Sequence, residues 1–159
     1  MLCSFRDFCL LLSEVTIHSY GDDNRPSYRS EPEHHGGVTV GVHLSAHPTY
    51  NHTTKQIERN GHYGASWHTV SKKTGDRSYD RRGKKPSAAA LFHVHHAMKA
   101  LITKARSEGH LRSVVLHGNT PKKHRIYKAA AERLGKQTGA KKVTHDPYYG
   151  STIHYGEDN

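Results

Sequence analysis

The chain is poor in cysteine. Cys3 and Cys9 are its only two cysteines, and both lie among the first ten of its 159 residues. A disulfide framework and a Cys-rich zinc module are therefore excluded for the body of the fold. We expect a reducing compartment such as the cytoplasm.

Apolar residues are also scarce, and long apolar runs are missing. Hydrophobic residues make up 33% and aromatic residues 8% of the chain, against an apolar share of about 45–50% in an average domain, so we expect a thin core. The longest apolar run near the N-terminus, residues 8–12, is far shorter than the ~18 residues that cross a bilayer. This segment lacks the small-residue cleavage pattern of a secretory signal. We therefore predict no membrane partner and no signal for secretion.

Acidic residues are few and unevenly placed. The chain has 24 Lys and Arg against 14 Asp and Glu, a net charge of +10 with its 16 histidines neutral. Residues 1–35 carry 3 basic and 6 acidic residues, whereas residues 36–159 carry 21 and 8, a net charge of +13. This shift predicts an acidic, partly disordered arm and linker over residues 1–36 and a basic domain over residues 37–159. The polar residues 21–37 in particular are predicted to be a linker or loop.

Period-two alternation marks the predicted strands. Residues 38–45 alternate between valine or leucine and small or polar side chains, which predicts a half-buried strand. Residues 62–73 show a second such pattern, and residues 77–82 are expected to form a short strand or the return of a hairpin. Three further short strands are predicted at residues 112–117, 143–145 and 151–155.

Two helices are predicted between these strands. Residues 87–107 carry apolar side chains at helical spacings, with Gly109 just beyond the end. Thr120 and Pro121 are the residue types of an N-cap and a first helical position, and the helix that they open is expected to close at Gly135. The predicted fold class is α/β, more closely α+β, with a central, mostly antiparallel mixed sheet and two main helices.

A basic segment leads into the first predicted helix. It brings two arginines, a glycine and two lysines to the helix N-terminus, where free amide groups and the helix dipole favour a phosphate. The segment therefore predicts an anionic ligand or cofactor. Its residues are Arg81, Arg82, Gly83, Lys84, Lys85, Pro86, Ser87 and Ala88.

At this point the chain resembles the GCN5-related N-acetyltransferase (GNAT) family. In that family a strand runs into a basic, glycine-rich loop that binds the pyrophosphate of acyl-coenzyme A. A long helix, a strand leading to an Asn and a helix carrying a Tyr follow. The order of elements over residues 62–135 is similar. The resemblance implies a GNAT-like fold, acetyl-coenzyme A (acetyl-CoA) as the cofactor and acetyl transfer to an amine.

The resemblance also implies roles for individual residues. Asn119 would orient the pantetheine or the leaving group, and Tyr127 would be the general acid for the departing thiolate. The attacking amine needs a base; Glu58, His68 and His117 are candidates, and no spacing selects among them. The diphosphate of the cofactor would be bound by Arg81, Arg82, Gly83, Lys84, Lys85, Ser87 and Ala88.

One alternative is a catalytically silent protein of the same fold. Lys85 and Ser87 stand where the family prefers small glycines, whose backbone can approach a pyrophosphate closely. Such a basic protein would associate with nucleic acid or with other subunits of a phage-type assembly, and it would be cytoplasmic or virion-associated. Cations at residues 122–128 and 136–142 lie near aromatic residues suited to stack on bases, namely Tyr148, Tyr149 and Tyr155.

A further alternative is a metal-dependent nuclease. His93-Val94-His95 with Tyr127 downstream is similar to the metal-binding His pair and nucleophilic Tyr of rolling-circle and transposon nucleases. The alanine-rich segment around the pair is predicted to be helical, however, and residues two apart on a helix diverge by roughly 200°. We therefore expect these histidines to flank an apolar stripe. The 16 histidines show no H-E-x-x-H or comparable spacing, so no metal site is predicted.

Overall fold

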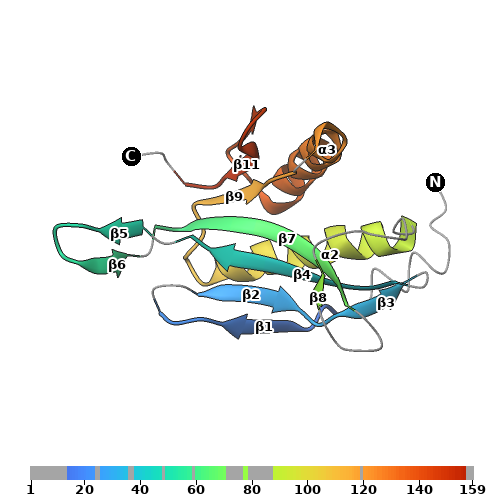
Figure 1. Cartoon of the computed structure of the whole chain (residues 1–159), viewed down its shortest axis with the longest axis horizontal. Coiled ribbons are helices and arrows are strands. Elements are labelled where there is room, and N and C mark those ends of the chain that lie inside the picture. Colours follow the sequence, from blue (N-terminus) through green and yellow to red (C-terminus); the bar gives the residue numbers. More distant parts are fainter. Residues whose placement is uncertain are drawn as a thin grey trace.

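We describe the chain from a computed structural model, in which the described residues are 14–23, 26–35, 38–47, 49–58, 60–70, 77–78, 88–118 and 120–156. They form one large sheet, a separate small hairpin and two helices. Figure 1 shows α2 (Ala88–Ser107) alongside β4 (Val38–Ala46) and β7 (His62–Val70). It shows α3 (Pro121–Thr138) near β9 (Ser113–Leu116) and β11 (Gly150–His154).

The large sheet contains nine strands, and seven of them follow each other in the order β1-β2-β4-β7-β9-β11-β10. The other two lie off this path, because β3 pairs with β4 and β8 pairs with β7. Strands β5 (Thr49–Asn51) and β6 (Gln56–Glu58) form the separate hairpin. The strands of the large sheet are β1 (Ile17–Tyr20), β2 (Ser27–Ser30), β3 (Glu33–His35), β4 (Val38–Ala46), β7 (His62–Val70), β8 (Arg77–Ser78), β9 (Ser113–Leu116), β10 (Lys142–Asp146) and β11 (Gly150–His154).

One pair of neighbouring strands in the described sheet, β7 and β9, is parallel, and the other pairs are antiparallel. A parallel pair needs a long crossover connection, and α2 lies in the connection between β7 and β9. The predicted α+β class, with a mostly antiparallel mixed sheet and two main helices, is therefore confirmed.

Helix α2 packs on the sheet through an apolar stripe. Its buried side chains recur every three or four residues, as a helix with one core-facing side requires. Those from Ala97 to Ala105 share one core cluster with Val42, Leu44 and Tyr63. The helix is followed by Gly109 in the left-handed region, with φ of 73°, as the sequence predicted. The stripe consists of Ala90, His93, Ala97, Met98, Leu101, Ile102 and Ala105.

Helix α3 starts as predicted but ends later. The Thr120 hydroxyl accepts a hydrogen bond from the backbone N–H of Lys123 over 3.2 Å, which confirms the N-cap. The predicted end at Gly135 is wrong, because the helix continues to Thr138 and is closed by Gly139 with φ of 72°. Gly135 is instead a point of close packing, where an added Cβ would lie 2.8 Å from Cγ2 of Val143 on β10.

The prediction of a linker over residues 21–37 is wrong for residues 27–30 and 33–35, which form strands β2 and β3. Strand β2 pairs with β1 and with β4, and β3 also pairs with β4, so the sheet crosses the expected boundary at residue 36. Polar residues suit β2 because two serine hydroxyls accept hydrogen bonds from the backbone of β4. Ser27 accepts from Ala46 N over 2.9 Å, and Ser30 accepts from Val42 N over 3.0 Å. The first part of the predicted arm, residues 1–13, lies outside the described residues.

The middle of β4 is buried on both faces. Val40, Val42 and Leu44 are fully buried on the face that carries the helices, as the alternation predicted. On the other face His43 is 6% exposed, and its ring lies 4.6 Å from that of His68 on β7. The predicted half-buried strand is therefore more enclosed than expected.

In the described part of the chain, no helix combines the length and the apolar character that a membrane span requires.

Candidate functional site

A hydrogen bond between Tyr127 and Trp67 joins α3 to the sheet. Trp67 lies on β7, and Tyr127 lies in the second turn of α3. The indole Nε1 of Trp67 donates to Tyr127 Oη over 3.1 Å. An indole nitrogen only donates, so the Tyr127 hydroxyl is the acceptor here and keeps its own proton for another group. Both side chains are partly buried against the core.

This contact lies just beyond the end of the parallel ladder. Strands β7 and β9 pair from His62 opposite Ser113 to Ala65 opposite Leu116, whereas β7 continues to Val70. Ligands of open α/β sheets commonly bind beyond the carboxyl ends of parallel strands. The structure therefore places Tyr127 next to the point where this parallel pair ends.

The predicted phosphate-binding segment is mostly outside the described residues. Ala88 is the first residue of α2 and is exposed. Asn119, between β9 and α3, lies outside the described residues. The same applies to Arg81, Arg82, Gly83, Lys84, Lys85 and Ser87.

The three candidate bases lie in different places. His68 is 2% exposed, and because it follows Trp67 on β7 its side chain points to the face opposite Trp67 and Tyr127. Glu58 belongs to β6 in the separate hairpin. His117 directly follows β9 and is exposed, and its ring lies 5.7 Å from that of His124, one turn before Tyr127 on α3. The structure thus places His117 beside His124 on the helix that carries Tyr127, whereas His68 lies on the opposite face of the sheet.

The two histidines of the His93-Val94-His95 segment diverge, as predicted. Both lie on α2. His93 Nδ1 faces Glu33 on β3 over 3.3 Å, and His95 Nε2 is hydrogen-bonded to Gln137 on α3 over 2.9 Å. The pair therefore does not converge on one ion, which removes the arrangement that the nuclease alternative requires.

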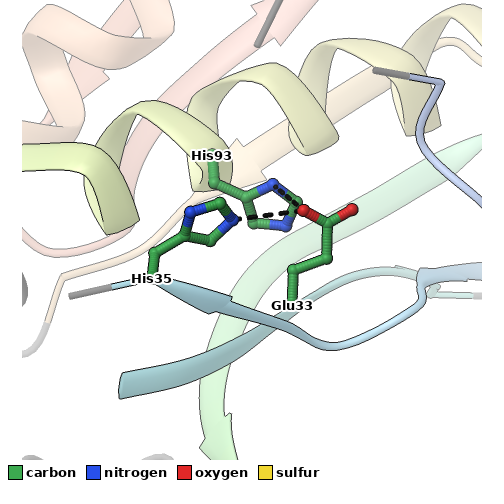
Figure 2. Close-up of side chains that lie close together, drawn as sticks. All are labelled: Glu33, His35 and His93. Atoms are coloured by element: carbon green, nitrogen blue, oxygen red, sulfur yellow. Dashed lines mark hydrogen bonds and ion pairs between the residues drawn. The ribbon is translucent and has the colours of Figure 1, made fainter. Parts of the chain in front are cut away.

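Glu33, His35 and His93 form a compact cluster between β3 and α2 (Figure 2). Oε2 of Glu33 lies 3.1 Å from Nε2 of His35 and 3.3 Å from Nδ1 of His93. The potential ligand atoms of the three residues all lie within 4.8 Å of one another. In the part of the chain that the structure describes, no second group of three such residues is present.

The cluster is enclosed on one side and open on the other. The side chain of His93 is 4% exposed, that of His35 15% and that of Glu33 35%. The imidazole rings stack with centroids 4.6 Å apart. Burial lowers the pKa of His93, the Glu33 carboxylate opposes this effect, and His35 and His96 add to it. The neutral imidazole that burial favours is the form that binds metals.

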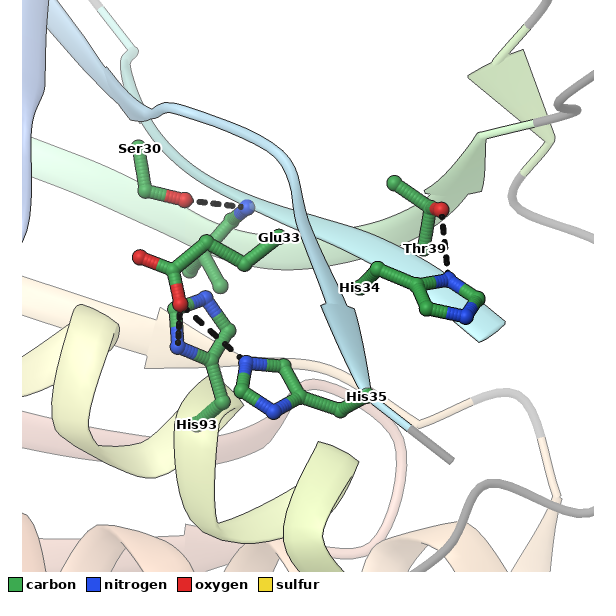
Figure 3. A network of polar contacts seen from close by, with 7 residues as sticks. Ser30, Glu33, His34, His35, Thr39 and His93 are labelled. Carbon is green, nitrogen blue, oxygen red and sulfur yellow. Dashed lines mark hydrogen bonds and ion pairs between the residues drawn. The ribbon is translucent and has the colours of Figure 1, made fainter. Parts of the chain in front are cut away.

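The neighbouring His34 points away from the cluster (Figure 3). Its Nδ1 lies 3.1 Å from the hydroxyl of Thr39, and its side chain is exposed. Successive side chains on a strand alternate between the two faces, so Glu33 and His35 face α2 while His34 faces the other way. The local strand geometry thus separates two adjacent histidines into different surroundings.

No match is found when the chain is compared with protein-family models, curated proteins and solved structures. Its function must therefore be inferred from the residues themselves.

Sequence reasoning missed the Glu33 cluster. A local signal exists, because Glu33 and His35 are two residues apart and would share a face on a strand. The segment reads as a linker, however, and His93 is 58 residues beyond His35 in the sequence. Only the pairing of β3 with β4 and the packing of α2 on β4 bring the three side chains together.

Two of the three tyrosines that were predicted to stack on bases are exposed. Tyr148 and Tyr149 are 81% and 76% exposed in the turn between β10 and β11. Tyr155 is only 9% exposed, and its hydroxyl lies 2.6 Å from that of Thr138. Burial raises the pKa of Tyr155. The expectation that Tyr155 stacks on bases is therefore wrong, because its ring packs in the core.

Proposed function

We propose that the chain is a GNAT-like acetyltransferase that transfers an acetyl group from acetyl-CoA to an amine. The observation that carries this proposal is the position of Tyr127. Its hydroxyl reaches the end of the parallel pair β7 and β9, the two strands that α2 connects. The order of strand, basic segment, long helix, parallel strand and Tyr-bearing helix is the one that the resemblance to this family implies.

The start of α2 suits the anionic part of acetyl-CoA. A helix N-terminus presents unpaired amide groups and the positive end of the helix dipole. The preceding residues add Arg81, Arg82, Lys84 and Lys85, and α2 has no acidic residue in its first turn to repel a phosphate. Gly83, Ser87 and Ala88 complete the segment proposed to bind the diphosphate.

The proposed chemistry divides between two side chains. Bound acetyl-CoA supplies an activated thioester. The amine nitrogen forms the new bond to the carbonyl carbon, the carbon–sulfur bond breaks, and Tyr127 Oη gives its proton to the departing sulfur. His117 takes the proton that the amine loses. Asn119 orients the leaving group in this proposal.

Binding is tested by thermal unfolding of the full chain with increasing acetyl-CoA, because a ligand that binds only the native state raises its stability. We expect a saturable rise in Tm that is lost in the double variant Arg82→Ala and Lys84→Ala. The double variant Lys141→Ala and Lys142→Ala removes the same charge from the start of β10 and should keep the rise. If both double variants lost the rise in Tm equally, acetyl-CoA binding would depend only on the net charge of the protein.

Turnover is tested separately with Tyr127→Phe. This variant keeps the ring but lacks the proposed acid, so acetyl-CoA should still raise Tm while the rate of coenzyme A release to a panel of amines falls by about 10²–10⁴-fold. Addition of divalent metal should change neither the rise in Tm that acetyl-CoA causes nor the rate of coenzyme A release. A Tm shift with no turnover by the unmodified chain would instead identify the catalytically silent alternative.

A third result would reject the proposal. If acetyl-CoA produced no shift and a short DNA duplex produced one that disappeared with salt, the chain would be a basic nucleic-acid-associated protein. The exposed rings of Tyr148 and Tyr149 would then be the first residues to replace.

A further inference from the structure

We propose that Glu33, His35 and His93 bind a divalent transition metal ion of the Zn²⁺ type and thereby join strand β3 to helix α2. This site is independent of the proposed acetyl transfer. Two imidazole nitrogens and one carboxylate oxygen are donors that Zn²⁺ accepts, and three protein ligands leave a fourth position for water or another ligand.

Two separations within the cluster match those of a zinc site, and the three potential ligand atoms all lie within 4.8 Å of one another. Ligand atoms at the ~2.0–2.1 Å bond length of Zn²⁺ in a tetrahedral site lie about 3.3 Å from each other. Glu33 Oε2 lies 3.1 Å from His35 Nε2 and 3.3 Å from His93 Nδ1. Figure 2 shows the two ring nitrogens directed at the same carboxylate oxygen from β3 and α2.

The burial of His93 is the second observation. Its side chain is 4% exposed on the core-facing stripe of α2, and its Nδ1 atom faces Oε2 of Glu33 over 3.3 Å. Burying a polar imidazole in a core is unfavourable unless a partner offsets the loss of water. A purely packing role would be met better by an apolar residue at this position. Glu33 at 35% exposure provides the access to solvent that an entering ion and a bound water need.

The surrounding fold gives the ion a structural effect. Strand β3 is three residues long and pairs with β4 alone in the described sheet. It holds two of the ligands, whereas His93 lies five residues into α2, about 7–8 Å along the helix axis from its first residue. An ion would therefore fix a short edge strand to the first half of the longer helix.

The test uses the full chain freed of metal by a chelator, with Zn²⁺ titrated by calorimetry and Co²⁺ as a spectroscopic probe. We expect one site per chain that survives a weak competing chelator, and the visible absorption of four-coordinate Co²⁺. Glu33→Gln and His35→Asn should weaken Zn²⁺ binding at least about tenfold, since loss of a group that merely hydrogen-bonds to a ligand already weakens binding by about 10–100-fold.

His34→Asn is the matched control. It removes a histidine from the same strand, adjacent to both ligands, but its side chain lies on the other face beside Thr39. This variant should bind Zn²⁺ as the unmodified chain does, which separates the cluster from diffuse binding to the other histidines. If His34→Asn and His35→Asn weakened binding equally, or if neither did, the proposed site would be wrong.

Hydrogen exchange gives a readout that does not depend on affinity. Zn²⁺ should slow exchange of the amide groups of β3 and of the first turns of α2, and Glu33→Gln should abolish the slowing. His93→Asn is a secondary variant because its side chain lies in the core, and its circular dichroism must match that of the unmodified chain. Protection elsewhere with none at β3 would overturn the proposal.

Discussion

The buried side chain of Tyr28 forms a hydrogen bond with a charged partner through its hydroxyl. Tyr28 on β2 is fully buried, and its hydroxyl donates a hydrogen bond to the carboxylate of Glu108, just after α2. Lys104 Nζ lies 2.9 Å from the same carboxyl group. The hydrogen bond from Tyr28, followed by the interactions with Lys104, lowers the pKa of Glu108. The contact links β2, near the edge of the sheet, to the end of α2.

Tyr28→Phe should destabilise the protein in a pH-dependent way. The variant keeps the ring and loses the hydroxyl, and we expect about 1 kcal/mol less free energy of unfolding near neutral pH, at the low end for charged pairs because Glu108 is partly exposed. A lowered folded-state pKa gives stability that is present above the ordinary value of 4.5 and lost as pH falls through the folded value. Urea unfolding at several pH values should therefore show the difference shrinking below 4.5.

Glu108→Gln is the control for this prediction. It keeps a hydrogen-bond acceptor for Tyr28 but cannot titrate. The pH-dependent part of the stability that the contact between Tyr28 and Glu108 contributes should therefore disappear. Adding Tyr28→Phe to this variant should then cause a loss that is the same above and below pH 4.5. A constant loss in the single Tyr28→Phe variant would show that the Glu108 carboxylate is not its partner.

Individual site residues could be predicted from sequence only where the chemistry is local. The helix that carries Tyr127 and the position of Ala88 at a helix start follow from short-range patterns. The contact of Tyr127 with Trp67 and the orientation of His68 depend on which strand lies beside which helix. Glu33 was missed for the same reason, since its partner His93 belongs to an element that meets β3 only in the folded chain.

Helix α3 contains a glycine whose two effects on stability oppose each other. Gly135 lies inside the helix, where alanine would be more favourable by about 0.8–1 kcal/mol. An added Cβ would lie 2.8 Å from Cγ2 of Val143 on β10 and 3.4 Å from Cβ of Ala140, and crowding of a packed interior typically costs about 1–3 kcal/mol. The cost of crowding therefore exceeds the gain in helix preference.

Gly135→Ala should accordingly destabilise the protein by about 1 kcal/mol, as measured by chemical denaturation. The same change made in a Val143→Ala background should be neutral or stabilising, because the obstructing methyl group is gone and the helix preference remains. A loss of equal size in both backgrounds would indicate that β10 does not pack on Gly135 as described.

The start of α3 depends on one hydroxyl. Thr120 caps the helix through the N–H of Lys123, and the first turn contains no acidic residue to offset the helix dipole. Thr120→Ala should reduce the free energy of unfolding by about 1 kcal/mol. Thr120→Ser keeps the hydroxyl and should lose only a small part of that amount in the same denaturation experiment. If both variants lost the same amount, the methyl group rather than the cap would be responsible.

The predictions of elements succeeded best where a pattern is local. Both helices and strands β4 and β7 carry a long periodicity of their own, and they lie close to the predicted positions. The short strands β9, β10 and β11 also lie close to the predicted positions. Strands β1, β2 and β3 are short and polar, so their residues show no alternation of apolar side chains. Strands β2 and β3 pair with β4, and serine hydroxyls of β2 accept hydrogen bonds from the backbone of β4. Strand β1 pairs in turn with β2. The pairing partners of these strands, and not an apolar pattern of their own, explain why they form.

The net positive charge of the molecule favours non-specific binding of anions, which must be distinguished from specific binding. Residues 36–159 carry a net charge of +13, so we expect any non-specific binding of polyanions to be driven by counterion release, whatever their sequence or shape. Such binding falls steeply with salt, by about 10³–10⁵-fold between 50 and 200 mM for six to ten phosphate contacts. A compact ligand held by a helix N-terminus and a few side chains releases fewer ions. Salt dependence can therefore separate the two kinds of binding.

We expect the affinity for acetyl-CoA to fall less steeply with salt than the affinity for a DNA duplex. Both dissociation constants are measured by fluorescence anisotropy or calorimetry over the same range of salt concentration, and the slopes of their logarithms are compared. The double variant Arg82→Ala and Lys84→Ala should weaken acetyl-CoA binding strongly while shifting DNA binding only in proportion to the lost charge. The double variant Lys141→Ala and Lys142→Ala should affect DNA alone. Equal slopes for the two ligands, together with equal effects of the two double variants, would mean that acetyl-CoA is bound as a generic polyanion and that the helix start of α2 has no selective role.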